Sequence, residues 1–548
     1  MKFYTNITRW GNNLLLREYK DGQRIDRKVK YQPTLYSPVT KPTEYKTLEG
    51  KYVTPVKHLS MKDAREWVDN YKNQPHLVYG NTMYPYAYLA DEYPNDVEWD
   101  IDKILIVTID IEVECENGFP NPEEASEPLL SITVKNHSNK QIMVWGMENF
   151  HTNRKDITYV QCESETHLIQ EFLAFWESNR PDVITGWNTE FFDVPYICNR
   201  ILNVMDEKNL KRLSPWGGVS SRDMYSQGRT HQLFDIQGVA HLDYYDLYRK
   251  FTYTNQESYR LDHIAYVELG ERKDGNPYET FRDWYTKDYQ SFIEYNITDV
   301  ELVDKLEDKM KLIELCLTMA YDAKVNYMDV LGSVKYWDMI IYNYLRKKNI
   351  VIPQKRENKK SEKFEGAYVK DPQVGEHKWV MSFDLNSLYP HLIMQYNISP
   401  ETLYSKKPLW KKPKVEDLLN KKVNGELMSN LKKSGLTLTP NGALFKTDKK
   451  GFLPEIMQTM YDDRVKYKKL MIQAKKEYER TQEPKLLKDI AKYNNIQMAK
   501  KISLNSAYGA IGNNWFRYYN LLVAEAITTS GQLSIRYIES TLNGYINK

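Results

Sequence analysis

Strand-like and helix-like segments alternate between residues 105 and 312, and this alternation constrains the fold more than any other feature of the sequence. β-Branched and alternating segments indicate strands, whereas apolar residues at helical spacing indicate helices. Strands that alternate with helices fold as a sheet covered by helices, so the region is predicted to be an α/β domain. The predicted elements are a strand over Ile104–Val113, a hairpin over Leu129–Val144, a helix over Thr166–Ser178, a strand over Asp182–Trp187, a helix over Phe192–Leu202 and a long helix over Asp288–Met319.

The composition is that of a large intracellular protein. The 548 residues correspond to three or four domains at about 150 residues each. The four cysteines form no Cys-x-x-Cys pair, which argues against a disulfide scaffold and a cysteine zinc site and fits a reducing compartment. The start, MKFYTNITRWGNN, lacks the apolar core of a signal peptide, and no apolar run approaches about 18 residues, so neither secretion nor membrane insertion is expected.

Charge is distributed unevenly although the net charge is only +2. Residues 91–116 hold ten acidic residues and one lysine, a balance of −9, and residues 462–501 hold twelve basic and six acidic residues, a balance of +6. A further basic stretch runs from Arg346 to Lys360. Separate acidic and basic zones suggest a metal site beside a surface for a polyanion. Ordinary solvated faces are the alternative, and composition alone favours that alternative.

Outside the α/β region, the chain is predicted to contain short strands near its start and mostly helices beyond residue 360. The first 100 residues read as short strands and turns around a helix over Met61–Lys72, and the segment 353–363 resembles a linker. Farther along the chain, the pattern predicts a strand over Lys378–Leu385, two long helices within 455–510 separated near Gln482–Pro484, and a helix over Ala524–Asn547.

Four carboxylates in three segments form the first candidate site. Asp110 and Glu112 lie two apart on a predicted strand, so both project from one face. Asp193 lies where a strand passes into a helix, and Tyr295 and Asp299 are spaced i, i+4 on a helix face. Several carboxylates around two cations about 3.5–4 Å apart suit phosphodiester hydrolysis, because one cation helps to generate hydroxide and the other stabilises the leaving oxygen. An isolated Asp-x-Glu pair is more often a solvated strand face.

The second candidate site begins at Asp384, at the end of the strand predicted over Lys378–Leu385. An aspartate there can hold Mg²⁺ while the backbone N–H groups that follow face a triphosphate. Tyr389 is bulky enough to pack under a sugar and exclude a 2′-hydroxyl. A buried strand with a capping aspartate explains this stretch equally well.

Cationic helix faces add to this second site. Lys501, Asn505 and Tyr508 follow i, i+4, i+7 spacing and share one helix face, and Gly509 would let the backbone approach a base pair closely. A solvated amphipathic helix explains the other lysines but not this Asn-Ser-x-Tyr-Gly pattern.

The preceding predicted helix repeats this spacing with Arg464 and Lys468. Two antiparallel helices with cations facing one groove would clamp a triphosphate, and the guanidinium fork suits bidentate phosphate contacts.

The carboxylate segments resemble the three exonuclease motifs of the family B DNA polymerases. The resemblance implies an RNase H-like 3′–5′ exonuclease domain with metal ligation by Asp110, Glu112, Asp193 and Asp299 and with Tyr295 orienting the attacking water.

Two later segments resemble polymerase motifs A and B of the same family. The resemblance implies that Asp384 ligates a metal, and it implies nucleotide binding by Leu385, Tyr389, Arg464, Lys468, Lys501, Asn505, Tyr508 and Gly509. Residues 241–248 resemble a strand and turn of the exonuclease domain, Ser220–Ile236 its β-hairpin, and Glu365–Val369 the connector to the polymerase domain.

Further stretches resemble the replicative DNA polymerases of T-even-like bacteriophages. These stretches are Arg212-Leu-Ser-Pro, Val351-Ile-Pro-Gln, Asn397-Ile-Ser-Pro-Glu-Thr and Gly512-Asn-Asn-Trp-Phe-Arg-Tyr-Tyr519, and the resemblance covers essentially the whole chain.

The expected fold class is therefore an α/β multidomain protein with an RNase H-like exonuclease domain, a partial palm and two-helix fingers. The expected domains are an N-terminal domain over 1–104, the exonuclease domain over 105–312, a helical return to the N-terminal domain over 313–355, the first part of the palm over 356–450, the fingers over 451–512 and the start of a second palm segment over 513–548.

The resemblance also implies cofactors and partners. Two-metal sites would hold Mg²⁺ or Mn²⁺, and the partners would be primer-template DNA, single-stranded 3′ ends and deoxynucleoside triphosphates in the host cytoplasm. The family uses a second palm carboxylate in a Tyr-Gly-Asp-Thr-Asp-type hairpin, and no such string occurs over 510–548. We therefore expect the chain to stop partway through the palm, and synthesis to need a complementing C-terminal chain that also carries the thumb and the contact with a sliding clamp.

Three functions follow from these expectations. The first is the N-terminal part of a phage polymerase that synthesises DNA with a complementing chain. The second is a stand-alone 3′–5′ exonuclease, which is compatible with the first. The third is a DNA-binding protein without catalytic activity, which the intact carboxylate motifs make the least favoured.

Overall fold

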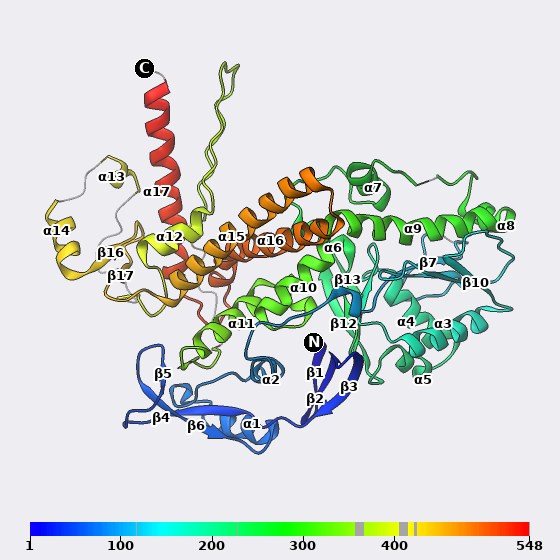
Figure 1. Ribbon diagram of the computed structural model, residues 1–548, viewed down its shortest axis with the longest axis horizontal. Helices are drawn as coiled ribbons and strands as arrows, with labels where there is room; N and C mark the ends of the chain where they lie inside the picture. The colour runs from blue at the N-terminus through cyan, green and yellow to red at the C-terminus, as the bar shows by residue number, and fades with distance from the viewer. Residues whose placement is uncertain are drawn as a thin grey trace. The chain divides into compact units, whose positions relative to one another are not determined.

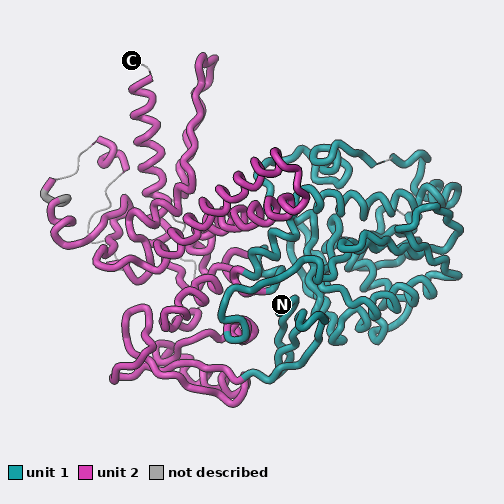
Figure 2. Tube along the Cα trace, in the orientation of Figure 1, with its two compact units in different colours: residues 1–31, 91–321, 326–331 teal, residues 32–90, 322–325, 332–548 magenta. Residues whose placement is uncertain are grey.

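The computed structural model describes residues 1–116, 118–226, 228–273, 275–356, 366–404, 415–420 and 425–546. Glu365 and most of the linker predicted over 353–363 lie outside these residues. The chain divides into two compact units: unit 1 comprises residues 1–31, 91–321 and 326–331, and unit 2 comprises residues 32–90, 322–325 and 332–548 (Figure 2). Among the helices that the structure describes, none combines the length and the hydropathy needed to cross a bilayer.

Unit 1 is built on a six-stranded mixed sheet with the strand order β10-β9-β8-β7-β11-β14 (Figure 1). Its strands are β7 (Ile106–Val113), β8 (Leu129–Asn136), β9 (Ile142–Gly146), β10 (Ile157–Gln161), β11 (Val183–Thr185) and β14 (Ala240–His241). Neighbours β7, β8 and β9 pair antiparallel, whereas β11 pairs parallel with both β7 and β14. The strands predicted over Ile104–Val113 and Asp182–Trp187 and the hairpin predicted over Leu129–Val144 are thereby confirmed.

Helices cover both faces of this sheet, because successive side chains of a strand point to opposite faces. One core packs the sheet against α3 (Glu165–Asn179) and α4 (Asp193–Val204), and it includes Ile109 and Ile111 of β7. The other core packs it against α8 (Phe281–Lys287) and α9 (Tyr289–Met310). Since Asp110 and Glu112 alternate with Ile109 and Ile111, they project toward α9.

Unit 1 also contains a separate three-stranded sheet, a β-hairpin and several further helices. Lys311 adopts a left-handed conformation (φ 58°) and divides the long helix predicted over Asp288–Met319 into α9 and α10. The other elements are β1 (Lys2–Trp10), β2 (Asn13–Lys20) and β3 (Gln23–Val29), which form an antiparallel sheet; β12 (Val219–Ser226) and β13 (Arg229–Ile236), which form a hairpin; and α5 (Glu207–Leu210), α6 (Tyr244–Phe251), α7 (Leu261–Leu269) and α10 (Leu312–Ala323).

Unit 2 is dominated by long helices. The predicted pair within 455–510 is confirmed as α15 (Phe452–Thr481) and α16 (Pro484–Ile511), which pack closely along one another, and Gln482 ends α15 in a left-handed conformation. The other helices are α1 (Met61–Asn70), α2 (Tyr84–Glu92), α11 (Ser333–Arg346), α12 (Leu388–Tyr396), α13 (Val415–Leu419), α14 (Gly425–Ser434) and α17 (Leu521–Ile546). The strands are β4 (Thr34–Pro38), β5 (Tyr45–Thr47), β6 (Tyr52–Lys57), β15 (Ile350–Val351), β16 (Leu436–Leu438) and β17 (Leu444–Lys446).

The strand predicted over Lys378–Leu385 is wrong. These residues form an exposed segment that bends at Lys378 and Trp379 and has no ladder of backbone hydrogen bonds among the described residues, and Figure 1 shows them as part of a long projecting loop before α12. A strand is stable only when a neighbour satisfies its backbone groups, and the described part of unit 2 places no strand beside this one.

Candidate nuclease and nucleotide sites

Three carboxylates converge between β7 and α9 in unit 1. One ligand oxygen from each of Asp110, Glu112 and Asp299 lies within 4.8 Å of the other two. Glu112 and Asp299 are buried, with relative exposures of 8% and 7%. The period-two spacing on β7 and the position of Asp299 on α9 therefore bring together residues that are 187 to 189 positions apart in the sequence.

The fourth predicted carboxylate, Asp193, begins α4 beside this group. Its Oδ1 accepts a hydrogen bond of 3.0 Å from the backbone N–H of Ile111, the residue between Asp110 and Glu112 on β7. Burial raises the pKa of Asp193 to about 7, although the hydrogen bond from Ile111 opposes that rise. Asp193 is therefore tied to the strand that carries the first two carboxylates, while its oxygens lie outside the closest group of three.

A buried aspartate shapes the loop that leads to Asp193. Asp243 accepts hydrogen bonds from the backbone N–H groups of Asn188 (3.0 Å) and Glu190 (2.9 Å). Burial raises the pKa of Asp243 to about 8, even though these N–H groups favour the ionised form. Asn188 adopts a left-handed conformation (φ 66°), which asparagine tolerates better than most residues. Asp243 therefore holds the backbone of this loop in place, and the fixed loop determines the residue at which α4 begins.

The structure adds Lys273, a residue that the sequence pattern did not single out. Its ammonium group donates a hydrogen bond to Asp299 Oδ2 and another of 3.3 Å to the hydroxyl of Tyr295, and it lies 4.7 Å from the centre of that ring. Burial alone would lower the pKa of Lys273, but the charges of Asp299 and Asp110 raise it. Lys273 follows α7 in a loop without periodicity, so no spacing rule could have linked it to α9.

Burial and mutual repulsion raise the pKa values of the clustered carboxyl groups. For Asp110 the main cause is burial, followed by the charges of Asp299, Asp193 and Glu112. Burial and the charge of Asp299 likewise raise the pKa of Tyr295 to about 12, so its phenol stays protonated and can donate a hydrogen bond near neutral pH.

The residues present fit a divalent cation. Asp299 Oδ1 is a buried oxygen without a hydrogen-bond partner among the described residues, and buried polar atoms of this kind are normally paired. Carboxylate oxygens are the ligands that Mg²⁺ and Mn²⁺ prefer. Asp110, Glu112 and Asp299 would hold such an ion, and Asp193, which accepts a hydrogen bond from Ile111 between the first two ligands, would contribute to the same site. The bound ion would generate hydroxide and stabilise a leaving oxygen.

Asp110 and Asp299 line a cavity of about 1030 Å³ within unit 1. Its walls combine aromatic rings with cations, a combination that suits single-stranded nucleic acid because bases stack on rings and phosphates attract positive charge. Phe119, which is 84% exposed, packs against Phe192 with ring centroids 5.1 Å apart. The aromatic and cationic residues that line the cavity are Phe119, Trp187, Phe191, Phe192, Tyr245, Tyr259, Tyr295, Arg229, Arg260 and Lys273.

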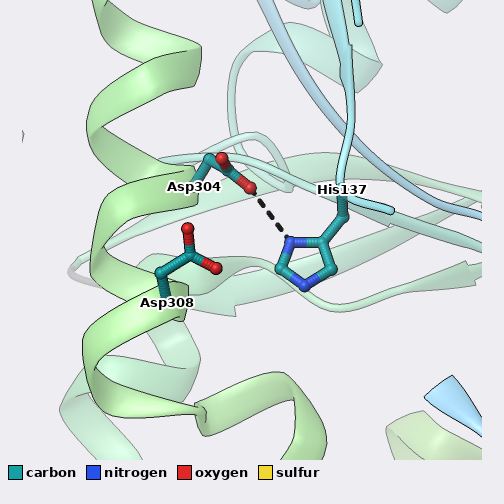
Figure 3. Close-up of side chains that lie close together, drawn as sticks. All are labelled: His137, Asp304 and Asp308. Atoms are coloured by element: carbon teal, nitrogen blue, oxygen red, sulfur yellow. Dashed lines mark hydrogen bonds and ion pairs between the residues drawn. The ribbon is translucent and has the colours of Figure 1, made fainter. Parts of the chain in front are cut away.

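Figure 3 shows a second acidic cluster, in which Asp304 and Asp308 of α9 lie near His137, and neighbouring lysines make this cluster an ion-pair network. Asp304 accepts a hydrogen bond from His137 (3.0 Å), and Lys140 contacts both Asp304 (2.7 Å) and Asp308 (3.0 Å). Lys135 adds a further ion pair to Asp304 at 3.1 Å. Two ammonium groups therefore already neutralise the carboxylates that a metal would need.

The candidate nucleotide site lies in unit 2, around a cavity of about 410 Å³. Arg464 of α15 donates a hydrogen bond of 3.0 Å to the hydroxyl of Ser387, which anchors the guanidinium group at the start of α12. Asp384 is the only acidic residue among those that line this cavity, and it is exposed. Six predicted residues border the cavity: Asp384, Leu385, Tyr389, Arg464, Lys501 and Asn505.

Three predicted residues lie outside that lining. Tyr508 of α16 packs against Tyr389 with ring centroids 5.1 Å apart, so it adjoins the cavity through a neighbour. Lys468 of α15 is exposed, and Gly509 has open space where a side chain would be. The predicted nucleotide-binding roles of all these residues remain predictions.

Comparisons with known proteins agree with this arrangement. Residues 83–264 match the model of the family B DNA polymerase exonuclease domain, and residues 333–547 match that of DNA polymerase family B. The DNA-directed DNA polymerase of Escherichia phage RB69 is 32% identical over an alignment that covers all of this chain and 67% of that protein. The chain belongs to the family B DNA polymerases.

Other members of the family are also similar. The DNA-directed DNA polymerase of Enterobacteria phage T4 is 31% identical, again over all of this chain and 67% of that protein. A DNA polymerase of Pyrococcus glycovorans is 25% identical over 84% of this chain and 54% of its own length. The family B match thus includes both the exonuclease domain and part of the polymerase domain, as the sequence motifs predicted.

Proposed function

We propose that this chain is a 3′–5′ exonuclease that removes nucleotides from single-stranded DNA ends, on an RNase H-like domain over 105–312. The observation that carries the proposal is the group of three carboxylates, Asp110, Glu112 and Asp299, in which Asp299 has a buried oxygen without a hydrogen-bond partner among the described residues. Asp110 and Asp299 also line the aromatic and cationic cavity. Asp193 completes the proposed ligand set. The cavity would take the frayed 3′ end, and the carboxylates would place Mg²⁺ or Mn²⁺ at the scissile phosphate.

Tyr295 and Lys273 extend this proposal to the attacking water. The phenol of Tyr295 remains a hydrogen-bond donor and acceptor near neutral pH, and Lys273 lies beside both that phenol and Asp299. We therefore assign to Tyr295 the orientation of the water, and to Lys273 the balancing of negative charge before and during phosphate binding.

Two aspartates of one helix provide a matched test. Asp299 and Asp308 both belong to α9, but Asp299 lies in the carboxylate group whereas Asp308 contacts Lys140 on the surface. Asp299→Ala should reduce Mg²⁺-dependent release of mononucleotides from 3′-labelled single-stranded DNA by about a hundredfold or more, because a metal ligand is lost. Asp308→Ala should retain the wild-type rate. Equal rates for both variants would refute the proposed site.

We also propose that the chain contributes the partial palm (356–450) and fingers (451–512) of a DNA polymerase. In this assignment Asp384 binds one metal, Arg464 and Lys501 bind the triphosphate, and Tyr389 excludes a 2′-hydroxyl. The cavity beside Ser387 supports it, because it gathers the cations of α15 and α16 around the start of α12. Lys468, Tyr508 and Gly509 would act from the same helix faces.

Synthesis would require a second carboxylate, which we propose comes from a complementing C-terminal polypeptide that also carries the thumb and the contact with a sliding clamp. The exposed segment before α12 supports this proposal: Trp379, Val380, Met381 and Phe383 are between 58% and 95% exposed. Large apolar residues gathered on a surface commonly mark an interaction site. A partner strand along residues 378–385 would cover them and supply the missing backbone hydrogen bonds.

The test is templated synthesis in a reconstituted mixture. The chain mixed with the C-terminal third of a phage family B polymerase should extend a primer with deoxynucleoside triphosphates, as expected for replication in the host cytoplasm, and Asp384→Ala should abolish the extension. Absence of extension with every such fragment would refute the proposed polymerase role, and extension by the unmixed chain would refute the need for a complementing chain.

A further inference from the structure

Asn296 is a buried polar residue that touches the carboxylate group from α9. Its side chain is fully buried, and its Nδ2 donates a hydrogen bond of 2.6 Å to Asp110 Oδ2. Asn296 and Asp299 are three residues apart, so both face the sheet from one side of the helix. The amide therefore contacts the first carboxylate of β7 from the helix that supplies the last one.

Two hydroxyl groups on β8 hold the other end of this amide. Ser131 donates a hydrogen bond of 3.0 Å to Asn296 Oδ1, and Thr133 donates a second one to the same oxygen. In the antiparallel pairing of β7 with β8, Thr133 lies opposite Asp110 and Ser131 lies opposite Glu112. The hydroxyl groups are therefore positioned by the same two strands that position the carboxylates.

These partners determine the orientation of the amide. An ionised carboxylate can only accept hydrogen bonds, so it requires the NH₂ side of the amide. The hydroxyl groups can donate to the carbonyl side, and two such donors on one oxygen disfavour a flip that would turn the carbonyl oxygen toward Asp110. The hydrogen bonds that run from Ser131 and Thr133 through Asn296 to Asp110 thus have one favourable direction, and Ser131, Thr133 and Asn296 are fully buried.

We infer that Asn296 is a positioning residue of the nuclease site, which holds Asp110 through Oδ2 so that its other oxygen is directed to a divalent cation. The inference rests on the proposed exonuclease function, and it concerns the orientation of a ligand. Groups that hydrogen-bond to metal ligands commonly change metal affinity by about 10- to 100-fold when they are removed.

The experiment measures Mn²⁺ binding to the full chain by electron paramagnetic resonance of the free ion, together with nucleotide release. Asn296→Ala should weaken Mn²⁺ binding by about 10- to 100-fold. The metal concentration for half-maximal release should rise by a similar factor, while the rate at saturating metal should change much less. Asn326→Ala is the control, because the side chain of Asn326 also makes two hydrogen bonds in unit 1, both partly buried and both to the backbone of Ile7, but is not among the residues that form the carboxylate group or line its cavity. It should bind Mn²⁺ as the wild-type chain does.

A double-mutant cycle separates positioning from general destabilisation. Thr133→Val keeps the shape of the side chain but removes its hydroxyl, so it should weaken Mn²⁺ binding severalfold in the wild-type chain. In the Asn296→Ala background the same change should have no further effect, because the amide that the hydroxyl orients is absent. Thermal unfolding in chelator identifies any variant that fails to fold, and Thr133→Val alone then still tests the inference.

The outcomes distinguish the inference from the proposed function. Wild-type Mn²⁺ affinity in a folded Asn296→Ala chain, or an equal effect of Thr133→Val in both backgrounds, would overturn the positioning role. A wild-type chain that binds Mn²⁺ but releases no nucleotide would overturn the exonuclease proposal and leave the positioning role standing. Mn²⁺ binding that is weaker in the variants as described, with nucleotide release that follows it, supports both.

Discussion

Replacing Asp304 by asparagine tests whether the cluster in Figure 3 is an ion-pair network. Burial of this carboxyl group would raise its pKa, but hydrogen bonds from His137 and Lys140 and the charge of Lys135 lower the pKa to about 2. The ordinary value is 3.8, so the lowered pKa corresponds to about 2–3 kcal/mol of stability at neutral pH. Asp304 is only 3% exposed, so solvent screening reduces this value little.

The sign of the pH dependence follows from the depressed pKa. Stability from Asp304 is fully present above the unfolded value of 3.8 and is lost as the pH falls toward 2. Asp304→Asn should therefore lower the protection of α9 amides against hydrogen exchange by about sixtyfold at pH 7 but only by about tenfold at pH 3. Hydrogen exchange suits this chain, since it reports local opening without assuming that all domains unfold together.

A neighbouring aspartate of the same helix, Asp308, provides the control for this prediction. Asp308→Asn removes a half-exposed partner of Lys140, so its effect at pH 7 should stay below about 1 kcal/mol. Added Mg²⁺ should not change the protection conferred by Asp304. A loss that is the same at pH 3 and pH 7, or protection that depends on Mg²⁺, would refute the ion-pair interpretation.

Three further predictions concern packing, thiol reactivity and the nuclease site. Arg517→Met should destabilise unit 2 by about 3–5 kcal/mol, because the buried guanidinium makes bonds of 2.7 and 2.9 Å to Asp338; adding Asp338→Leu should recover most of the loss, as measured by hydrogen exchange of α11. Thiol reagents at pH 8 should react slowly with the folded chain and rapidly after unfolding, because three cysteines are buried and burial with nearby acids raises the pKa of Cys115 to about 11. Tyr295→Phe should lower nucleotide release by about 10- to 100-fold while Mn²⁺ binding, measured by electron paramagnetic resonance, stays unchanged.

Local periodicity predicted much of unit 1 and the core of its candidate site. The two-residue spacing of Asp110 and Glu112 placed both on the α9 face of β7, and helical spacing placed Tyr295 and Asp299 toward them. These predictions succeeded because strand and helix geometry alone decide which side chains share a face.

Other features depend on contacts that no local pattern encodes. Lys273 reaches Asp299 from a loop, and the role of Asn296 depends on hydroxyl groups on a distant strand. The strand expected over Lys378–Leu385 did not form, since a strand requires a neighbour that local sequence cannot supply. The break at Lys311 was also missed, because the apolar spacing continues through it.

The most direct measurement follows a 5′-labelled single-stranded oligonucleotide during incubation with the purified chain and Mg²⁺. The account predicts a ladder of products shortened one nucleotide at a time from the 3′ end, which is absent with chelator and strongly reduced in Asp110→Ala. Internal cleavage, shortening from the 5′ end, or an undiminished ladder in Asp110→Ala would contradict the assignment of these carboxylates to a 3′–5′ exonuclease.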